Sequence, residues 1–222
     1  MTGDERKRFF EFYKKNPSRS LDGFFKDLQR IDGNNELLSN FLARRTHVDC
    51  LIMGCSYWAN PNALISFLHG YNARVLPRVV AIDVLPDALQ EAVRNHSPFV
   101  PLVCPAQDTP FLDGYFDIVV ADGLLNCCGF SQHKPIIREM HRITKNGALV
   151  LLGLAHAPQR TVLKPTERAM EVHCRQLKDF RALFQSAGFA FVRKSSYQTL
   201  LSEGSPIRID NCIARKRLDR PQ

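Results

Sequence analysis

From residue 48 onward, short apolar runs alternate with stretches in which apolar and polar residues recur at helical spacing. The runs that we interpret as strands are Val48–Met53, Val79–Ile82, Phe99–Val103, Phe116–Ala121 and Ala148–Leu152. A turn and a helical stretch follow each run. The pattern therefore predicts an α/β fold, in which a largely buried parallel sheet is built with right-handed crossovers and has helices on both faces.

The end of the chain breaks this alternation. A helix predicted over Leu177–Ala187 stops at Gly188, and strand-like runs follow at Ala190–Lys194 and Ile207–Arg215. The connection between these two runs is polar and leaves no room for a helix. We therefore expect the last two strands to form an antiparallel pair.

Residues 1–47 place aromatic and aliphatic residues at helical spacing among charged ones. The pattern predicts two or three amphipathic helices, interrupted at Asn16-Pro17-Ser18 and at Asp32-Gly33-Asn34. We divide the chain into an N-terminal helical extension (1–47), a main domain (48–217) and a tail (218–222). The apolar stripes of the first helices either pack on the main domain as ordinary core or roof a ligand site, and the sequence leaves both readings open.

The composition adds a positive charge to this picture. The chain of 222 residues is 45% hydrophobic, enough to bury the core of one domain, and its net charge is +8. Such a charge favours acidic partners: nucleic acid, an anionic membrane surface or a negatively charged substrate. The basic residues are scattered along the chain, however, and this is typical of a solvated surface.

Seven cysteines, an odd number without a CxxC pair or a secretion signal, indicate reduced thiols inside the cell. Apolar runs stay well below the ~18 residues of a membrane helix, so we expect a cytoplasmic protein without a membrane span. The Cys and His positions show no ligand spacing, and we expect no metal site. The adjacent Cys127 and Cys128 are interpreted as packing residues rather than as reactive thiols.

Two strand ends carry the candidate chemistry. The first strand runs into Gly54-Cys55-Ser56, and the second ends at Asp83. A buried strand that leads into a tight turn and a helix, with an acid at the tip of the next strand, is typical of a sheet that binds a nucleotide ribose.

Several strings resemble the class I S-adenosylmethionine (SAM)-dependent methyltransferases. These segments occur in the family's order, and the similarity as a whole extends over about residues 48–216. The segments are Val79–Leu89, Ala106–Phe111, Asp113–Val120, Arg138–Leu151 and Leu183–Phe189. The resemblance implies a Rossmann-like, doubly wound sheet in the order 3-2-1-4-5-7-6, mostly parallel with an antiparallel last strand. It also implies SAM as the cofactor.

The resemblance assigns the cofactor site residue by residue. Gly54, Cys55 and Ser56 would form the turn beside the methionine part of SAM, and Asp83 would accept hydrogen bonds from both ribose hydroxyls. Val84 would lie against the adenine, whose edge Ala106 and Gln107 would approach. Asp83 could instead only cap the following helix.

The acceptor side is assigned to the ends of later strands. Asp122 and Gly123, after the fourth strand, would lie near the cofactor amino group and the acceptor, although Asp122 could equally cap a helix. His156, after the fifth strand, is the candidate general base or substrate contact. A lone loop histidine such as His156 is more often a solvated side chain. His133, expected in the loop after the fourth strand, is a second candidate for contact with the substrate.

The chain departs from the family pattern in the first turn. Ile52 stands where relatives carry an acid, and Ser56 and Trp58 stand where they carry glycines, which let the backbone approach the cofactor closely. Trp58 would point away from the ligand, form a wall of its site or fill its space. Pro105 replaces an acid that reads the adenine amino group in many relatives.

From these residues we predict SAM-dependent methyl transfer to an oxygen, nitrogen or carbon of a small-molecule acceptor, mainly by in-line positioning and desolvation. The altered turn motivates an alternative, a catalytically inactive binding or regulatory protein of the same fold. A nucleic-acid methyltransferase is a further alternative that the positive charge motivates, and a nicotinamide dehydrogenase fits the glycine pattern and the final strand pair poorly. The oligomeric state is left open.

Overall fold

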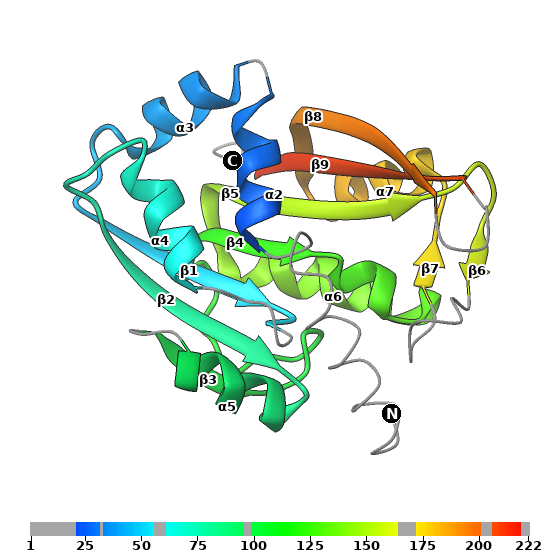
Figure 1. Ribbon diagram of the computed structural model, residues 1–222, viewed down its shortest axis with the longest axis horizontal. Coiled ribbons are helices and arrows are strands. Elements are labelled where there is room, and N and C mark those ends of the chain that lie inside the picture. Colours follow the sequence, from blue (N-terminus) through cyan, green and yellow to red (C-terminus); the bar gives the residue numbers. More distant parts are fainter. Residues whose placement is uncertain are drawn as a thin grey trace.

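The computed structural model describes residues 21–31, 33–55, 61–95, 99–163, 172–200 and 206–218. Its main feature is a seven-stranded sheet in the order β3-β2-β1-β4-β5-β9-β8 (Figure 1). The strands of this sheet are β1 (His47–Met53), β2 (Leu76–Asp83), β3 (Val100–Val103), β4 (Phe116–Asp122), β5 (Thr144–His156), β8 (Phe189–Leu200) and β9 (Pro206–Lys216).

The sheet confirms the predicted topology. Strands β1 to β5 are parallel, whereas β9 runs antiparallel to both β5 and β8. The last two strands are numbered 9 and 8 rather than 7 and 6 because a short hairpin precedes them. The buried strands were predictable because a parallel sheet covered on both faces needs continuous apolar runs.

Helices cover both faces of the sheet, as expected of a doubly wound fold. The side chains of α2, α3, α4 and α5 join one core cluster, and those of α6 and α7 join the other. The helices are α2 (Leu21–Gln29), α3 (Asn34–Leu42), α4 (Pro61–His69), α5 (Pro86–Asn95), α6 (Phe130–Ile143), α7 (Leu177–Ser186) and the 3₁₀ turn η3 (Leu124–Cys127). Among the described residues, none of these helices has the length and hydrophobicity to span a bilayer.

The N-terminal helices belong to the first of these cores. Phe24, Phe25 and Leu28 of α2 are buried, and the Phe25 ring stacks on Phe67 of α4 with a centroid distance of 4.6 Å. Helices α2 and α3 thus cover the sheet, and their apolar side chains form part of its core. Residues 1–20 and the break at Pro17 lie outside the described residues, and the domain boundary at residue 47 stays a prediction.

A small hairpin that the sequence did not reveal follows β5. Strands β6 (Thr161–Leu163) and β7 (Val172–Cys174) pair antiparallel, and Arg175 then forms a parallel bridge with His156 at the end of β5. The hairpin therefore stands at the carboxyl end of β5 (Figure 1). Strands of three residues are too short to show an alternating pattern, which is why it was missed.

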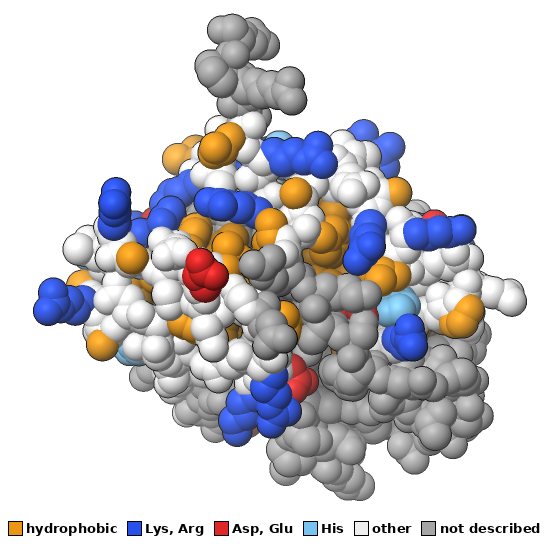
Figure 2. All heavy atoms as spheres, turned by 90° about the horizontal axis from the view of Figure 1, so that it is seen from above, with side chains coloured by type: hydrophobic (Ala, Val, Ile, Leu, Met, Phe, Trp, Pro, Cys, Tyr) orange, Lys and Arg blue, Asp and Glu red, His pale blue; other side chains and the backbone are white. Residues whose placement is uncertain are grey.

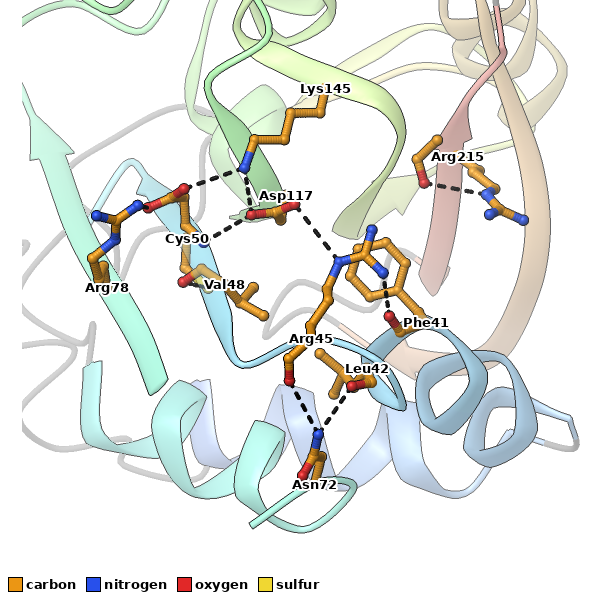
Figure 3. Close-up of polar contacts among 12 residues, drawn as sticks. Phe41, Leu42, Arg45, Val48, Cys50, Asn72, Arg78, Asp117, Lys145 and Arg215 are labelled. Carbon is orange, nitrogen blue, oxygen red and sulfur yellow. Dashed lines mark hydrogen bonds and ion pairs between the residues drawn. The ribbon is translucent and has the colours of Figure 1, made fainter. Parts of the chain in front are cut away.

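The amino-terminal ends of the strands are joined by a network of charges (Figure 3). The Lys145 Nζ atom lies 3.2 Å from Asp49 Oδ2 and 2.7 Å from Asp117 Oδ2. Arg78 pairs with Asp49 at 2.5 Å, and Arg45 with Asp117 at 3.7 Å. Both carboxylates are almost buried, so the three cations compensate charges that would be costly alone. The network fixes β1, β2, β4 and β5 at the edge opposite the candidate site.

Candidate functional site

The turn after β1 is folded onto the end of β2. The backbone N–H groups of Gly54 and Cys55 both donate to the Ile82 carbonyl, at 3.0 and 2.9 Å. Gly54 has a φ of +73°, and a Cβ there would lie 2.9 Å from Cδ1 of Leu124. The positive φ favours glycine here, and a side chain would in addition displace the end of the Leu124 side chain. The predictions for Ser56 and Trp58 fall outside the described residues.

Asp83 ends β2 beside this turn and is 9% exposed. Its Oδ1 atom accepts a hydrogen bond of 2.9 Å from the Leu85 N–H, so the carboxylate is held at the strand tip. This contact resembles a cap before α5, but an ionised carboxylate can accept several hydrogen bonds, so capping does not exclude ribose binding.

Exposed apolar side chains lie next to Asp83. Val103 pairs with Asp83 in the register of β2 and β3, and Val103 and Val84 are 54% and 59% exposed. A nucleoside has a diol at one end and a flat base at the other. A carboxylate that can bind the diol, next to exposed apolar surface that can contact the base, suits such a ligand. The place assigned to Val84 in the sequence is compatible with contact to a base.

The loop after β3 is held in place by α6. Glu139 accepts hydrogen bonds from the Thr109 N–H at 2.9 Å and from Arg142 Nη2 at 2.6 Å. Arg142 also donates to Asp113 at 2.7 Å. Burial opposes ionisation of Glu139, but the hydrogen bonds from Arg142 and Thr109 outweigh it and lower the pKa of Glu139. Within the loop so held, Ala106 is buried and Gln107 exposed.

Asp122, at the end of β4, is inserted against the backbone of β5. Its partner in the sheet register is Gly153, where an added Cβ would lie only 1.9 Å from Asp122 Oδ1. Gly153 thus leaves the space that the carboxyl group occupies. Burial, together with the negative charge of Asp27, raises the pKa of Asp122 from 3.8 to about 7. The preceding helix α2 provides Asp27, which also lies 3.4 Å from the Asn211 amide nitrogen.

Asp27, Gly153 and Asn211 are parts of this site that the sequence did not indicate. They come from α2, β5 and β9, and only the folded chain brings them to the end of β4. The first helices therefore contribute a charge at this edge as well as core packing. A possible signal was Gly153 itself, because a glycine inside an apolar strand often marks a close approach of another group.

His156 lies on the other face of the sheet from Asp122. It is three residues beyond Gly153 on β5, and side chains alternate between faces along a strand. Its Nε2 atom lies 3.2 Å from Oδ1 of the fully buried Asp210. The structure therefore does not bring His156 together with Asp122, and its role as a general base stays a prediction.

His133 is buried in α6 and contacts other residues of the chain through both ring nitrogens. Nε2 lies 3.1 Å from the Cys128 carbonyl, and Nδ1 accepts a hydrogen bond of 2.8 Å from Arg175 Nε. The ring also stacks on Phe180. Burial lowers the pKa of His133 to about 4, so the ring is neutral near pH 7. These contacts account for the buried position of His133 by packing within the chain. Its contact with a substrate stays a prediction.

The cysteines, the metal-binding residue types and the pocket in the described part of the chain do not add a reactive group to this site. Burial and the nearby Asp83 raise the pKa of the Cys128 thiol to about 11, which keeps it protonated near pH 7. No group of His, Cys, Asp or Glu in the described part of the chain could hold a metal ion. An open pocket of about 530 Å³ is lined by Arg142, Lys145 and Lys216 among others, but it lies at the amino-terminal edge and its cations already bind groups of this chain.

Comparison with known proteins agrees with this arrangement. Residues 65–152 match the sequence model of a methyltransferase domain family. An uncharacterized methyltransferase of Synechocystis is 31% identical over 137 residues, which are 57% of this chain. The aligned part spans 63% of that relative, less than two thirds of its length.

Two solved structures share the fold. A SAM-dependent methyltransferase of Methanosarcina mazei superposes with a TM-score of 0.67 at 18% identity, covering 82% of this chain and 98% of that one. The 1,6-didemethyltoxoflavin-N1-methyltransferase of Burkholderia thailandensis, with 1,6-didemethyltoxoflavin and S-adenosylhomocysteine bound, gives 0.62 at 15% identity, covering 96% and 87%. The resemblance found in the sequence is thus confirmed: residues 65–152 match a methyltransferase domain family, and the chain has the fold of the class I SAM-dependent methyltransferases.

Proposed function

We propose that the protein transfers a methyl group from SAM to an oxygen, nitrogen or carbon of a small-molecule acceptor in the cytoplasm. The observation that carries this proposal is the joined pair of strand ends. The Gly54 turn is hydrogen-bonded to the end of β2, directly beside the Asp83 carboxylate. A turn whose glycine lets a ligand approach the backbone and a carboxylate that can accept hydrogen bonds from a diol thus lie side by side at the carboxyl edge, where open α/β sheets bind their ligands, and this supports cofactor binding there.

The residues present fit SAM at the points that the structure describes. Asp83 would hold the ribose, and the exposed Val84 and Val103 would lie against the adenine. Gln107, exposed on the loop that Glu139 holds, would approach the adenine edge. Gly54 and Cys55 would lie beside the methionine part, and Asp122 and Gly123 would lie near its amino group and the acceptor.

When bound, SAM supplies a methyl group already activated on a sulfonium. The chain then needs to orient the acceptor in line with that methyl group and exclude water. An oxygen or nitrogen acceptor also loses a proton, and Asp122 is suited to take it, since a base with a pKa near 7 is half ionised at neutral pH. We therefore assign this step to Asp122 in place of His156, which lies on the other face of β5.

The acceptor class is inferred from a relative of the same fold and from the surface charge. The Burkholderia enzyme of the same fold holds a small heterocycle, which favours a small molecule. In the face that Figure 2 shows, Lys and Arg side chains lie apart with uncharged surface between them, an arrangement that fits a solvated surface better than a track for nucleic acid. A binding protein without turnover is the second candidate, because the departures at Ser56, Trp58 and Pro105 bear directly on the cofactor site.

Calorimetric titration with S-adenosylhomocysteine tests the cofactor site. Asp83→Asn should weaken binding about 10- to 100-fold, because two charge-assisted hydrogen bonds become neutral ones. Asp87→Asn is the matched control, since Asp87 is an exposed acid four residues away, and it should bind like the wild type. Equal affinity in all three proteins would refute the assignment of Asp83. Binding without methyl transfer to any small molecule in a broad acceptor panel would favour the second candidate.

A further inference from the structure

Two arginines lie on the ring of Phe130, where α6 begins. The Arg160 Cζ atom is 3.9 Å from the ring centroid, and that of Arg175 is 5.0 Å from it. The His173 imidazole meets the same ring edge-on at 5.0 Å. One aromatic ring thus holds two guanidinium groups close together, although like charges repel each other.

Arg175 is the fixed member of this pair. It donates from Nε to His133 Nδ1 at 2.8 Å and from Nη2 to the Phe130 carbonyl at 3.0 Å. Both acceptors are uncharged, because burial keeps His133 neutral. Burial and the neighbouring Arg160 lower the pKa of Arg175, which is a sign of a cation in an unfavourable environment.

Neither guanidinium has a carboxylate partner in the part of the chain that the structure describes. Asp179 is near enough to act on Arg175 through its field, but it forms no ion pair with it. Arg160 is exposed, and its side chain forms no hydrogen bond with the described residues. The half-buried Arg175 and the accessible Arg160 therefore lie close together, and both carry N–H donors that bind no carboxylate among the described residues.

The arginine pair lies at the carboxyl end of β5, beside α6. Arg175 forms a bridge to the last residue of β5, and Arg160 follows that strand by four residues. The Asn126 amide donates to the Ala155 and His173 carbonyls, at 2.7 and 2.9 Å, which ties the loop after β4 to the hairpin. The hairpin is thus hydrogen-bonded to the ends of β4 and β5, and Asp83 stands at the carboxyl end of β2 in the same sheet.

We propose that Arg160 and Arg175 bind an anionic oxygen group of the acceptor, either a carboxylate or a phosphate. The proposal rests on the proposed methyl transfer and specifies its substrate as an acidic small molecule. Guanidinium groups bind both kinds of group through paired N–H donors. Arg175 supplies a fixed donor at the carboxyl end of β5, and the accessible Arg160 closes on the ligand from the solvent side. The overall charge of +8 raises the local concentration of such acceptors.

Binding of benzoate and of phenyl phosphate tests this proposal, with benzamide as the uncharged control ligand. Titration followed by NMR should show millimolar binding of at least one anion and none of benzamide. Arg160→Gln should weaken anion binding about tenfold, since one charge-assisted contact is lost. Arg138→Gln removes the same charge from an exposed position of α6 and should leave the affinity unchanged.

The two anions distinguish a carboxylate from a phosphate acceptor. Absence of binding of both anions, equal binding of benzamide, or an equal effect of Arg160→Gln and Arg138→Gln would overturn the proposal. S-adenosylhomocysteine is titrated into the same variants and should bind equally to both. Intact binding of S-adenosylhomocysteine without anion binding would refute the arginine site alone. Anion binding without S-adenosylhomocysteine binding would refute the proposed function and leave the arginine site standing.

Discussion

Replacing Asp122 by asparagine should stabilise the protein at pH 8. The carboxyl group has a pKa of about 7 in the folded chain and of 3.8 as its ordinary value, because the group is half-buried and lies near the negative charge of Asp27. The folded state therefore holds the proton more tightly than the unfolded state, and stability falls as the pH rises between these two values. Asparagine has nearly the same shape and carries no charge, so it removes this cost of ionisation.

The size of the effect follows from the pKa difference. About three units correspond to at most ~4 kcal/mol at pH 8, and because Asp122 is only half-buried we expect about 1–3 kcal/mol of added stability. At about pH 5 somewhat more than half of this gain should be absent, because the folded wild type is protonated there although the unfolded chain is already ionised.

Urea unfolding at both pH values measures this difference. Asp108→Asn, a change at an exposed acid, should shift the free energy of unfolding little at either pH. A gain for Asp122→Asn that is equal at both pH values, or a loss at pH 8, would refute the reasoning. A pH-dependent gain would mean that the chain keeps Asp122 at a cost in stability. Functional groups are often retained at such a cost.

Two other substitutions test the parts of the fold that position the site. Lys145→Met should lower the free energy of unfolding by about 1–3 kcal/mol, because it leaves Asp49 and Asp117 without their shared ammonium; the exposed Lys134→Met is the control, and an equally small loss in both urea titrations would count against the network. Gly153→Ala should destabilise the chain by displacing Asp122, whereas in an Asp122→Ala background the same change should cost far less. Additive effects in that double-mutant cycle would show that the two residues do not share the space.

The sequence predicted the sheet because its strands are buried on both faces and carry continuous apolar runs. It also placed Asp83 and Asp122 at strand ends, where both lie. The hairpin of β6 and β7 was missed because each strand has three residues. Directly after this hairpin, Arg175 lies beside the ring of Phe130.

The composition of the site depends on contacts that no local pattern encodes. Asp27 precedes Asp122 by almost a hundred residues in the chain. Its charge acts on Asp122 only because folding brings α2 close to the end of β4. The local sequence does not show which face of β5 the His156 side chain takes. That face follows from the register of β5 with β4, which tertiary packing determines.

A crystal structure of the complex with S-adenosylhomocysteine tests the central claim most directly. The account predicts that both ribose hydroxyls lie within hydrogen-bonding distance of the Asp83 carboxylate, that the adenine lies over Val84 and Val103, and that the methionine part follows the Gly54 turn toward Asp122. A complex in which the ligand lies elsewhere, or crystals at millimolar ligand in which the Trp58 side chain fills that space, would contradict it.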